Sequence, residues 1–89
     1  MKYYYGTKKN LLKTFIVKSR VSKTSQRTMN WEYGIRDIKN GIFVTDYAEY
    51  AKVYGPKVYE IIPSEEPFMV NNGIYFIPNG VKVKAKRIV

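Results

Sequence analysis

The clearest pattern of hydrophobic and polar positions lies near the end of the chain, where apolar residues and lysines alternate. The two alternating sets are Val81, Val83 and Ala85 on the one hand and Lys82, Lys84 and Lys86 on the other. Successive side chains of a strand point to opposite faces of its sheet. The pattern therefore predicts a strand over 81–89 that places its apolar set in the core and three ammonium groups on the other face.

Other short apolar runs are rich in β-branched and aromatic residues, which favour extended backbone. They predict strands over 1–5, 14–20, 42–44, 58–62, 68–70 and 74–77. Turn residues separate these runs, as at Gly6-Thr7, Asn40-Gly41, the acidic stretch 63–67 and Pro78-Asn79-Gly80. We expect a small α+β domain built on one sheet with one or two short helices.

The helix best supported by the pattern follows Asp46. Asp46 and Glu49 have the spacing of a capping box, in which the first residue accepts from the backbone and the second reaches back to it. Apolar or aromatic residues then recur at helical spacing, at Tyr47, Ala48, Ala51 and Tyr54. Gly55-Pro56 marks the end of this helix.

Two further segments differ in their pattern. Thr7 is placed to cap a short helix over 8–13, whose buried side would be Leu11 and Leu12. Residues 22–27 are polar and basic with no apolar period, which indicates an exposed loop.

Charge changes the picture, because the formal net charge of +9 is concentrated in two blocks. Residues 2–28 hold eight basic residues and no acid, and residues 81–89 hold four more, again without an acid. The carboxylates gather in the middle, at Asp46, Glu49, Glu60, Glu65 and Glu66. Segregated positive charge attracts polyanions, among which nucleic acid is the leading candidate.

Composition excludes several classes of site. The chain of 89 residues has no cysteine, which rules out disulfides and thiolate metal sites, and no histidine, which removes imidazole ligands and the usual general base. Glu65-Glu66 lies in the acidic turn, and Asp46 and Glu49 are explained by the helix cap. We therefore expect one domain with no metal, no cofactor and no catalytic carboxylate pair, located in the reducing cytoplasm.

Aromatic residues make up 16% of the chain, enough to fill a core and leave some rings outside. We expect Phe43, Tyr47, Tyr54, Tyr59, Tyr75 and Phe76 in the core. Alternation in the Tyr3-Tyr4-Tyr5 run leaves one or two rings on the outer face, and Trp31 adjoins the basic loop. Tyr3, Tyr4 and Trp31 are therefore the candidates for stacking on bases.

The basic residues are the candidate nucleic-acid contacts. They are Lys8, Lys9, Lys13, Lys18, Arg20, Lys23, Arg27, Lys82, Lys84, Lys86 and Arg87. RNA is favoured over duplex DNA, because no helix is long enough to fill a major groove and a sheet with a basic loop suits single-stranded or irregular targets. The alternative for the last three lysines is protection of an edge strand against aggregation.

Three segments taken in order resemble small ADP-ribosyltransferase domains. They are Tyr4-Tyr5-Gly6-Thr7, then Gly41–Asp46 with Tyr50–Gly55, and finally Ile74–Gly80 with the alternating strand. The resemblance implies a largely antiparallel, split β core with few helices. It also implies that Ile74 and Asn72 stand where the family has its catalytic glutamate and the acidic partner, and Tyr5 where it holds the nicotinamide nucleotide. The resemblance thus extends to architecture and not to activity.

The function expected is a non-catalytic RNA-binding protein. The Lys/Tyr/Asn-rich composition is similar to that of small accessory proteins of AT-rich, T-even-type phages, which implies a role in host takeover or counter-defence in the host cytoplasm, such as inhibition of a toxin ribonuclease. Two alternatives remain open: a minimal mono-ADP-ribosyltransferase, and a basic inhibitor that docks an acidic host protein.

Overall fold

A computed structural model describes residues 1–27 and 39–89 of the chain. Its strands form one sheet in the order β2-β7-β4-β1-β3-β6-β5, with antiparallel pairing throughout. The strands are β1 (Tyr3–Thr7), β2 (Thr14–Ile16), β3 (Gly41–Thr45), β4 (Lys57–Pro63), β5 (Phe68–Asn71), β6 (Ile74–Pro78) and β7 (Lys82–Arg87). Helix α2 (Ala48–Ala51) and a helical turn over 23–27 complete these elements. The expected α+β class, with an antiparallel sheet and two short helices, is confirmed.

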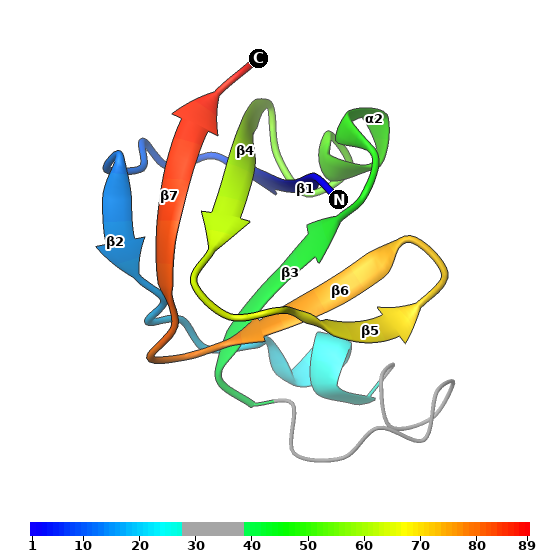
Figure 1. Cartoon of the computed structure of the whole chain (residues 1–89). Coiled ribbons are helices and arrows are strands. Elements are labelled where there is room, and N and C mark those ends of the chain that lie inside the picture. The colour runs from blue at the N-terminus through cyan, green and yellow to red at the C-terminus, as the bar shows by residue number, and fades with distance from the viewer. Residues whose placement is uncertain (28–38) are drawn as a thin grey trace.

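The sheet curls so that one of its faces becomes the interior (Figure 1). Val44 on β3 and Ile77 on β6 share a single core cluster with Ile61 on β4 and Val83 on β7. Tyr3 on β1 joins this cluster and meets Tyr75 edge to face, with ring centroids 5.1 Å apart. The core therefore lies within the curl of the sheet, and the outer face is left for other contacts.

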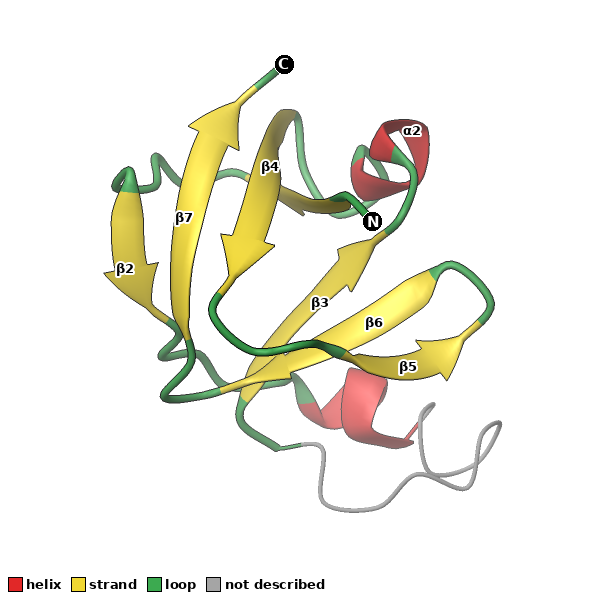
Figure 2. Ribbon diagram, in the orientation of Figure 1, coloured by secondary structure: helices red, strands yellow, loops and turns green. Residues whose placement is uncertain are grey.

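Short segments cover the outer face at two places (Figure 2). Helix α2 contacts β1, β3 and β4, and it helps to bury Gly6 and Val58 although both lie on that face. Farther along, Val21 packs with Phe76 and Phe43 on the outer side of β3 and β6, just before the helical turn 23–27. The outer face of β2, β7 and β4 keeps exposed side chains.

The start of the chain departs from the prediction. Gly6-Thr7 does not end the first strand, because both residues continue β1 and pair with β4. The expected helix over 8–13 is wrong, since no helix forms there. Thr7 Oγ1 instead accepts from the Lys9 N–H at 3.1 Å, and the Leu11 N–H donates to the Tyr59 hydroxyl at 3.1 Å. These bonds hold an irregular turn in place of a helix.

The segment after β2 was also predicted wrongly. The strand expected over 14–20 is limited to three residues, and the loop expected over 22–27 contains a helical turn. Ser22 caps this turn, because its Oγ accepts from the Ser25 N–H at 3.1 Å. Arg20 forms an isolated antiparallel bridge with Asn40. A helix of one turn needs no apolar period, which is why the pattern did not reveal it.

Helix α2 forms at the predicted place but is shorter and is capped differently. Tyr47 is the N-cap residue and makes no side-chain capping bond, so the expected capping box from Asp46 is absent. The Asp46 N–H donates to the Gly73 carbonyl at 3.2 Å, and Thr45 Oγ1 donates to the Tyr47 carbonyl at 2.8 Å. The Gly73 carbonyl thus accepts from the Asp46 N–H, for which a capping box would use the Glu49 carboxylate.

The core prediction holds for four of the six aromatic residues and fails on α2. Tyr59, Tyr75 and Phe76 are buried, and Phe43 is half-buried against Phe76. Tyr47 is 54% exposed and Tyr54 is 49% exposed. The helix ends at Ala51, and Ala51 alone among its four residues is buried. The tyrosines therefore remain at the surface.

Candidate nucleic-acid interface

The alternation over 81–87 predicts the orientation of β7 correctly. Val81 and Val83 are buried in the core, whereas Lys82, Lys84 and Lys86 are exposed on the outer face of the sheet. Residues two apart on a strand are separated by about 6.6–6.8 Å. The three ammonium groups therefore project from one straight row, at a spacing that suits successive phosphates of an extended single strand.

Strand β7 lies inside the sheet, paired with β2 on one side and β4 on the other. The hypothesis that these lysines guard a sheet edge is therefore wrong for Lys82 and Lys84, because β7 is not an edge strand there; at Lys86 the strand pairs with β4 alone. Strands β2 and β5 form the edges. The lysine row needs another explanation.

The neighbours of the row mix apolar and polar groups. Lys82 pairs with Ile16 on β2, and Lys84 lies between Thr14 on β2 and Ile62 on β4. Ile16 is 59% exposed and Ile62 is 60% exposed. We call this surface the lysine face, defined as Lys82, Lys84 and Lys86 with their outward-facing neighbours Thr14, Ile16, Glu60, Ile62 and Tyr4. It presents cations beside apolar side chains on which a base can rest.

One carboxylate lies within the lysine face. Glu60 pairs with Lys86 across the strands, and its Oε1 lies 3.5 Å from the Nζ of Lys2. Lys2 thus supplies a charge partner for Glu60. Because Lys2 already partners Glu60, this carboxylate neutralises less of the charge of the β7 lysines than its position opposite Lys86 suggests. The lysine row therefore keeps its positive charge.

The structure brings part of the N-terminal basic block to this face. Because β2 pairs with β7, Lys13 lies beside the end of β7, and its carbonyl accepts from the Ala85 N–H at 2.8 Å. Its side chain lies on the side of the strand opposite to Thr14. Lys18 follows β2 at the other end, where the Val17 N–H bonds to the Val81 carbonyl at 2.9 Å. Two blocks that are far apart in the sequence therefore meet.

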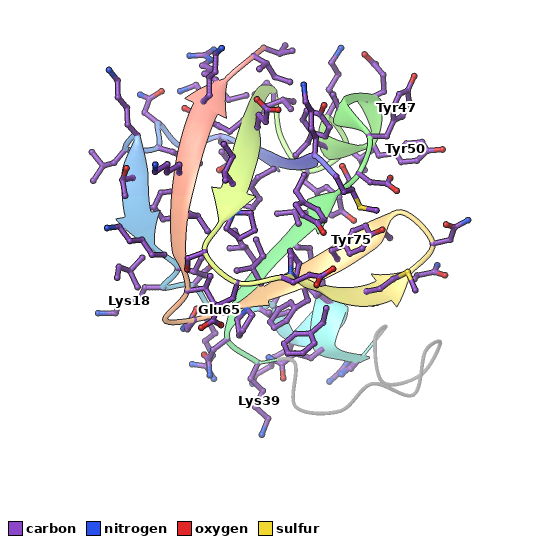
Figure 3. The ribbon with its side chains drawn as sticks, in the orientation of Figure 1. Lys18, Lys39, Tyr47, Tyr50, Glu65 and Tyr75 are labelled. Atoms are coloured by element: carbon purple, nitrogen blue, oxygen red, sulfur yellow. The ribbon has the colours of Figure 1, made fainter. Side chains whose placement is uncertain are left out.

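The remaining predicted contacts lie elsewhere. Lys8 and Lys9 are exposed on the turn after β1. Lys23 and Arg27 are exposed on the helical turn next to β3 and β6. Figure 3 shows Lys18 pointing away from the ribbon at the same end of the molecule as Lys39, a cation that our prediction did not include. The basic residues thus form the lysine face and a second group near the helical turn.

Of the three candidate stacking residues, the structure describes Tyr3 and Tyr4, which differ in their burial. Tyr3 is only 8% exposed and belongs to the core, so it is not available to stack on a base. Burial raises the pKa of its hydroxyl, with smaller contributions from the charge of Glu66 and from Tyr75. Tyr4 is half-buried on the lysine face, opposite Glu60. Trp31 lies outside the described residues.

Sequence reasoning missed an exposed aromatic pair on α2. The rings of Tyr47 and Tyr50 meet edge to face with centroids 5.1 Å apart, and both point outward in Figure 3. Their neighbours Glu49 and Lys52 form an exposed ion pair at 3.1 Å. The signal that could have revealed the pair is the Gly55-Pro56 stop, which leaves the helix too short to bury three tyrosines.

Other chemistry finds little support among residues 1–27 and 39–89. No group of three or more acidic, cysteine or histidine side chains could hold a metal ion there. Glu65 and Glu66 are both exposed. In the same part of the chain, no helix is both long and apolar enough to cross a bilayer.

No protein-family model, curated protein or solved structure matches this chain.

Proposed function

We propose that the protein is a non-catalytic RNA-binding protein that uses the lysine face as its main contact surface. The observation that carries this proposal is the exposed row of Lys82, Lys84 and Lys86, with Lys13 and Lys18 exposed before and after the neighbouring strand β2. Phosphate contacts of this kind supply most of the affinity for nucleic acid, without reading its sequence.

Single-stranded or irregular RNA fits this surface better than duplex DNA. Neither α2, with four residues, nor the helical turn 23–27 could fill a major groove. The exposed faces of Ile16 and Ile62 lie beside the lysines, so bases can rest on apolar side chains while the phosphates meet cations. Tyr4 offers an aromatic edge at the same face.

Two finer expectations belong to this proposal. The ADP-ribosyltransferase-like outline is supported by the order of the matching segments, which lie on β1, on β3 with α2, and on β6 with β7. The similarity in composition to phage accessory proteins supports a role in host takeover or counter-defence, with RNA as the means by which a toxin ribonuclease is blocked.

The alternatives make different predictions. A minimal ADP-ribosyltransferase would transfer label from NAD to protein or nucleic acid, whereas we expect no transfer because Ile74 stands in the position of the catalytic glutamate. An inhibitor that docks an acidic host protein would use the exposed basic residues for that protein, and it would show no RNA binding at low salt.

The test compares two variants that each lose one charge. Lys84→Gln removes the central lysine of the row, and Lys52→Gln removes an exposed lysine on the turn that follows α2. Fluorescence anisotropy with a labelled single-stranded RNA should show weaker binding for Lys84→Gln and nearly unchanged binding for Lys52→Gln. Equal affinities for both variants and the parent would place the contacts elsewhere, and no binding by the parent at low salt would overturn the proposal.

A further inference from the structure

A cleft beside the end of β7 has three basic residues in its lining. It has a volume of about 480 Å³ and is lined by Lys13 beside β2 and by Lys86 and Arg87 at the end of β7. All three side chains are exposed, and no carboxylate lines the cleft. The cleft is within the range of about 300–1,000 Å³ that is typical of small-ligand sites.

The polar groups around the cleft are held in place. Arg87 Nε donates to the Val89 carbonyl at 3.1 Å, which leaves the N–H groups of its two terminal nitrogens for another partner. Asn10 Oδ1 accepts from Lys57 Nζ at 2.5 Å, so the Asn10 amide nitrogen is left as a donor. An anion in the cleft would meet both charged and neutral donors.

The floor of the cleft is apolar and firm. Tyr59 is 5% exposed, and its hydroxyl accepts from the Leu11 N–H at 3.1 Å. Leu11 and Ala85 are half-buried and pack against the core cluster. A cationic rim above an apolar floor suits a ligand with an anionic end and a flat ring, such as a nucleotide.

We propose that this cleft binds the phosphorylated end of an RNA strand. A terminal phosphate monoester carries about −1.5 to −2 charges at neutral pH, as on phosphorylated side chains, so the basic residues that line the cleft favour it over an internal phosphodiester with a single charge. Lys86 belongs to both the cleft and the lysine face, so the strand leaves the cleft along β7 past Lys84 and Lys82. The cleft thereby sets the polarity of the bound strand.

This inference rests on the proposed RNA binding, and the experiment separates the two. Three RNAs of one sequence are compared: one with a 5′-phosphate, one with a 3′-phosphate and one with two hydroxyl ends. We expect one phosphorylated end to bind about tenfold more tightly than the hydroxyl form, as expected for one added hydrogen bond to a charged group. Which end it is fixes the direction of the strand.

Single-residue variants test whether the preference for a phosphorylated end arises in the cleft. Lys13→Gln should abolish the advantage of the phosphorylated end, because Lys13 lines the cleft and is not part of the row. The matched control Lys84→Gln should weaken all three RNAs by a similar factor and keep their ratio. Thermal midpoints of both variants check that the fold is intact. A preference that survives Lys13→Gln and Arg87→Gln would overturn the assignment to this cleft.

The remaining outcomes are also decisive. Equal binding of all three RNAs overturns the cleft proposal and leaves RNA binding intact. Should no RNA bind, the proposed function fails, and a nucleoside 5′-monophosphate then tests the cleft alone through the amide NMR signals of Leu11 and Ala85. Shifts that vanish in Lys13→Gln would retain the cleft as a phosphate monoester site, whereas unmoved signals would overturn it.

Discussion

Gly6 shows how a single residue connects local sequence to the fold. In sequence terms a glycine after three tyrosines ends a strand, yet Gly6 continues β1 and pairs with Val58. A Cβ at Gly6 would overlap the carbonyl oxygen of Ala51, because α2 packs directly on this point of the sheet. The glycine is required by the close approach of two backbones that the sequence pattern does not reveal.

We therefore predict that Gly6→Ala destabilises the protein by about 1–3 kcal/mol, the usual cost of overpacking. The control is Gly80→Ala, where nothing lies within 4 Å of the added Cβ but φ is +93°. The control should be destabilised only by the unfavourable φ, by about 1–2 kcal/mol. Urea unfolding of the three proteins gives the comparison, and a Gly6→Ala variant as stable as the parent would mean that α2 does not pack here.

The raised pKa values of two tyrosines predict that the protein loses stability at alkaline pH. Burial raises the pKa of the Tyr3 hydroxyl and also that of Tyr5, although a hydrogen bond with Thr7 partly offsets the effect at Tyr5. The unfolded chain releases these protons near pH 10.0, before the folded chain does. The contribution of both groups to stability is therefore complete below pH 10.0 and is lost as the pH rises through the folded pKa values.

The Tyr3→Phe/Tyr5→Phe variant carries neither proton and should lose less stability above pH 10.0 than the parent. The measurement is the free energy of unfolding in urea at a series of pH values on either side of 10.0. If the free energy of unfolding falls equally with pH in the double variant and in the parent, the raised pKa values are contradicted.

At the scale of elements, the fold was predictable where the pattern is long and local. Six strands of the sheet beyond β2 form near their predicted places, and the alternation on β7 gave the correct face to each lysine. The helix over 8–13 failed because Leu11 bonds to Tyr59, 48 residues away, which no local pattern contains. The capping box at Asp46 and Glu49 failed for a similar reason, since the Asp46 N–H donates to the carbonyl of Gly73, a residue distant in sequence.

The candidate site was predictable in its residues but not in its arrangement. The charge blocks identified the lysines, but only the strand order shows that β2 brings Lys13 beside Lys86. The exposure of Ile16 and Ile62 was not foreseen, because β-branched residues in a strand are usually taken as core. Adjacent Ile61 and Ile62 point to opposite faces, so one of them had to face outward.

The interior position of β7 leads to a prediction about the lysine row. Lys82→Gln/Lys84→Gln/Lys86→Gln should lose most RNA affinity, while its thermal midpoint stays close to that of the parent, because exposed substitutions usually change stability by no more than about 0.5 kcal/mol each. It should also remain largely free of aggregation, since β7 pairs with β4 over 83–87 and with β2 over 82–84. Light scattering and binding titrations measure the two effects.

The comparison for this variant is Arg20→Gln/Lys23→Gln/Arg27→Gln, which alters the exposed cations around the helical turn 23–27. This variant should bind RNA more weakly than the parent but more tightly than the row variant. Normal binding by the helical-turn variant would restrict the contact surface to the lysine face. Parental affinity in both variants would show that neither basic group is a binding site.

For the whole molecule, charge and shape act together. The net charge of +9 is spread over two sequence blocks, and the curl of the sheet brings parts of both to one surface while the acidic turn at Glu65 and Glu66 follows β4 at another part of the sheet. Bound RNA releases counterions for each phosphate that a lysine or arginine neutralises. The affinity should therefore depend on salt in proportion to the number of cations engaged.

The three lysines of the row, together with Lys13 and Lys18 on either side of β2, offer about five cations to a strand. With roughly 0.7 counterions released per contact on a single strand, the log–log plot of affinity against salt should have a slope near −3 to −4. Lys84→Gln should make the slope shallower by about 0.7, whereas Lys52→Gln should leave it unchanged. A slope near zero in the parent would mean that phosphates do not dominate binding, and it would favour a protein partner over RNA.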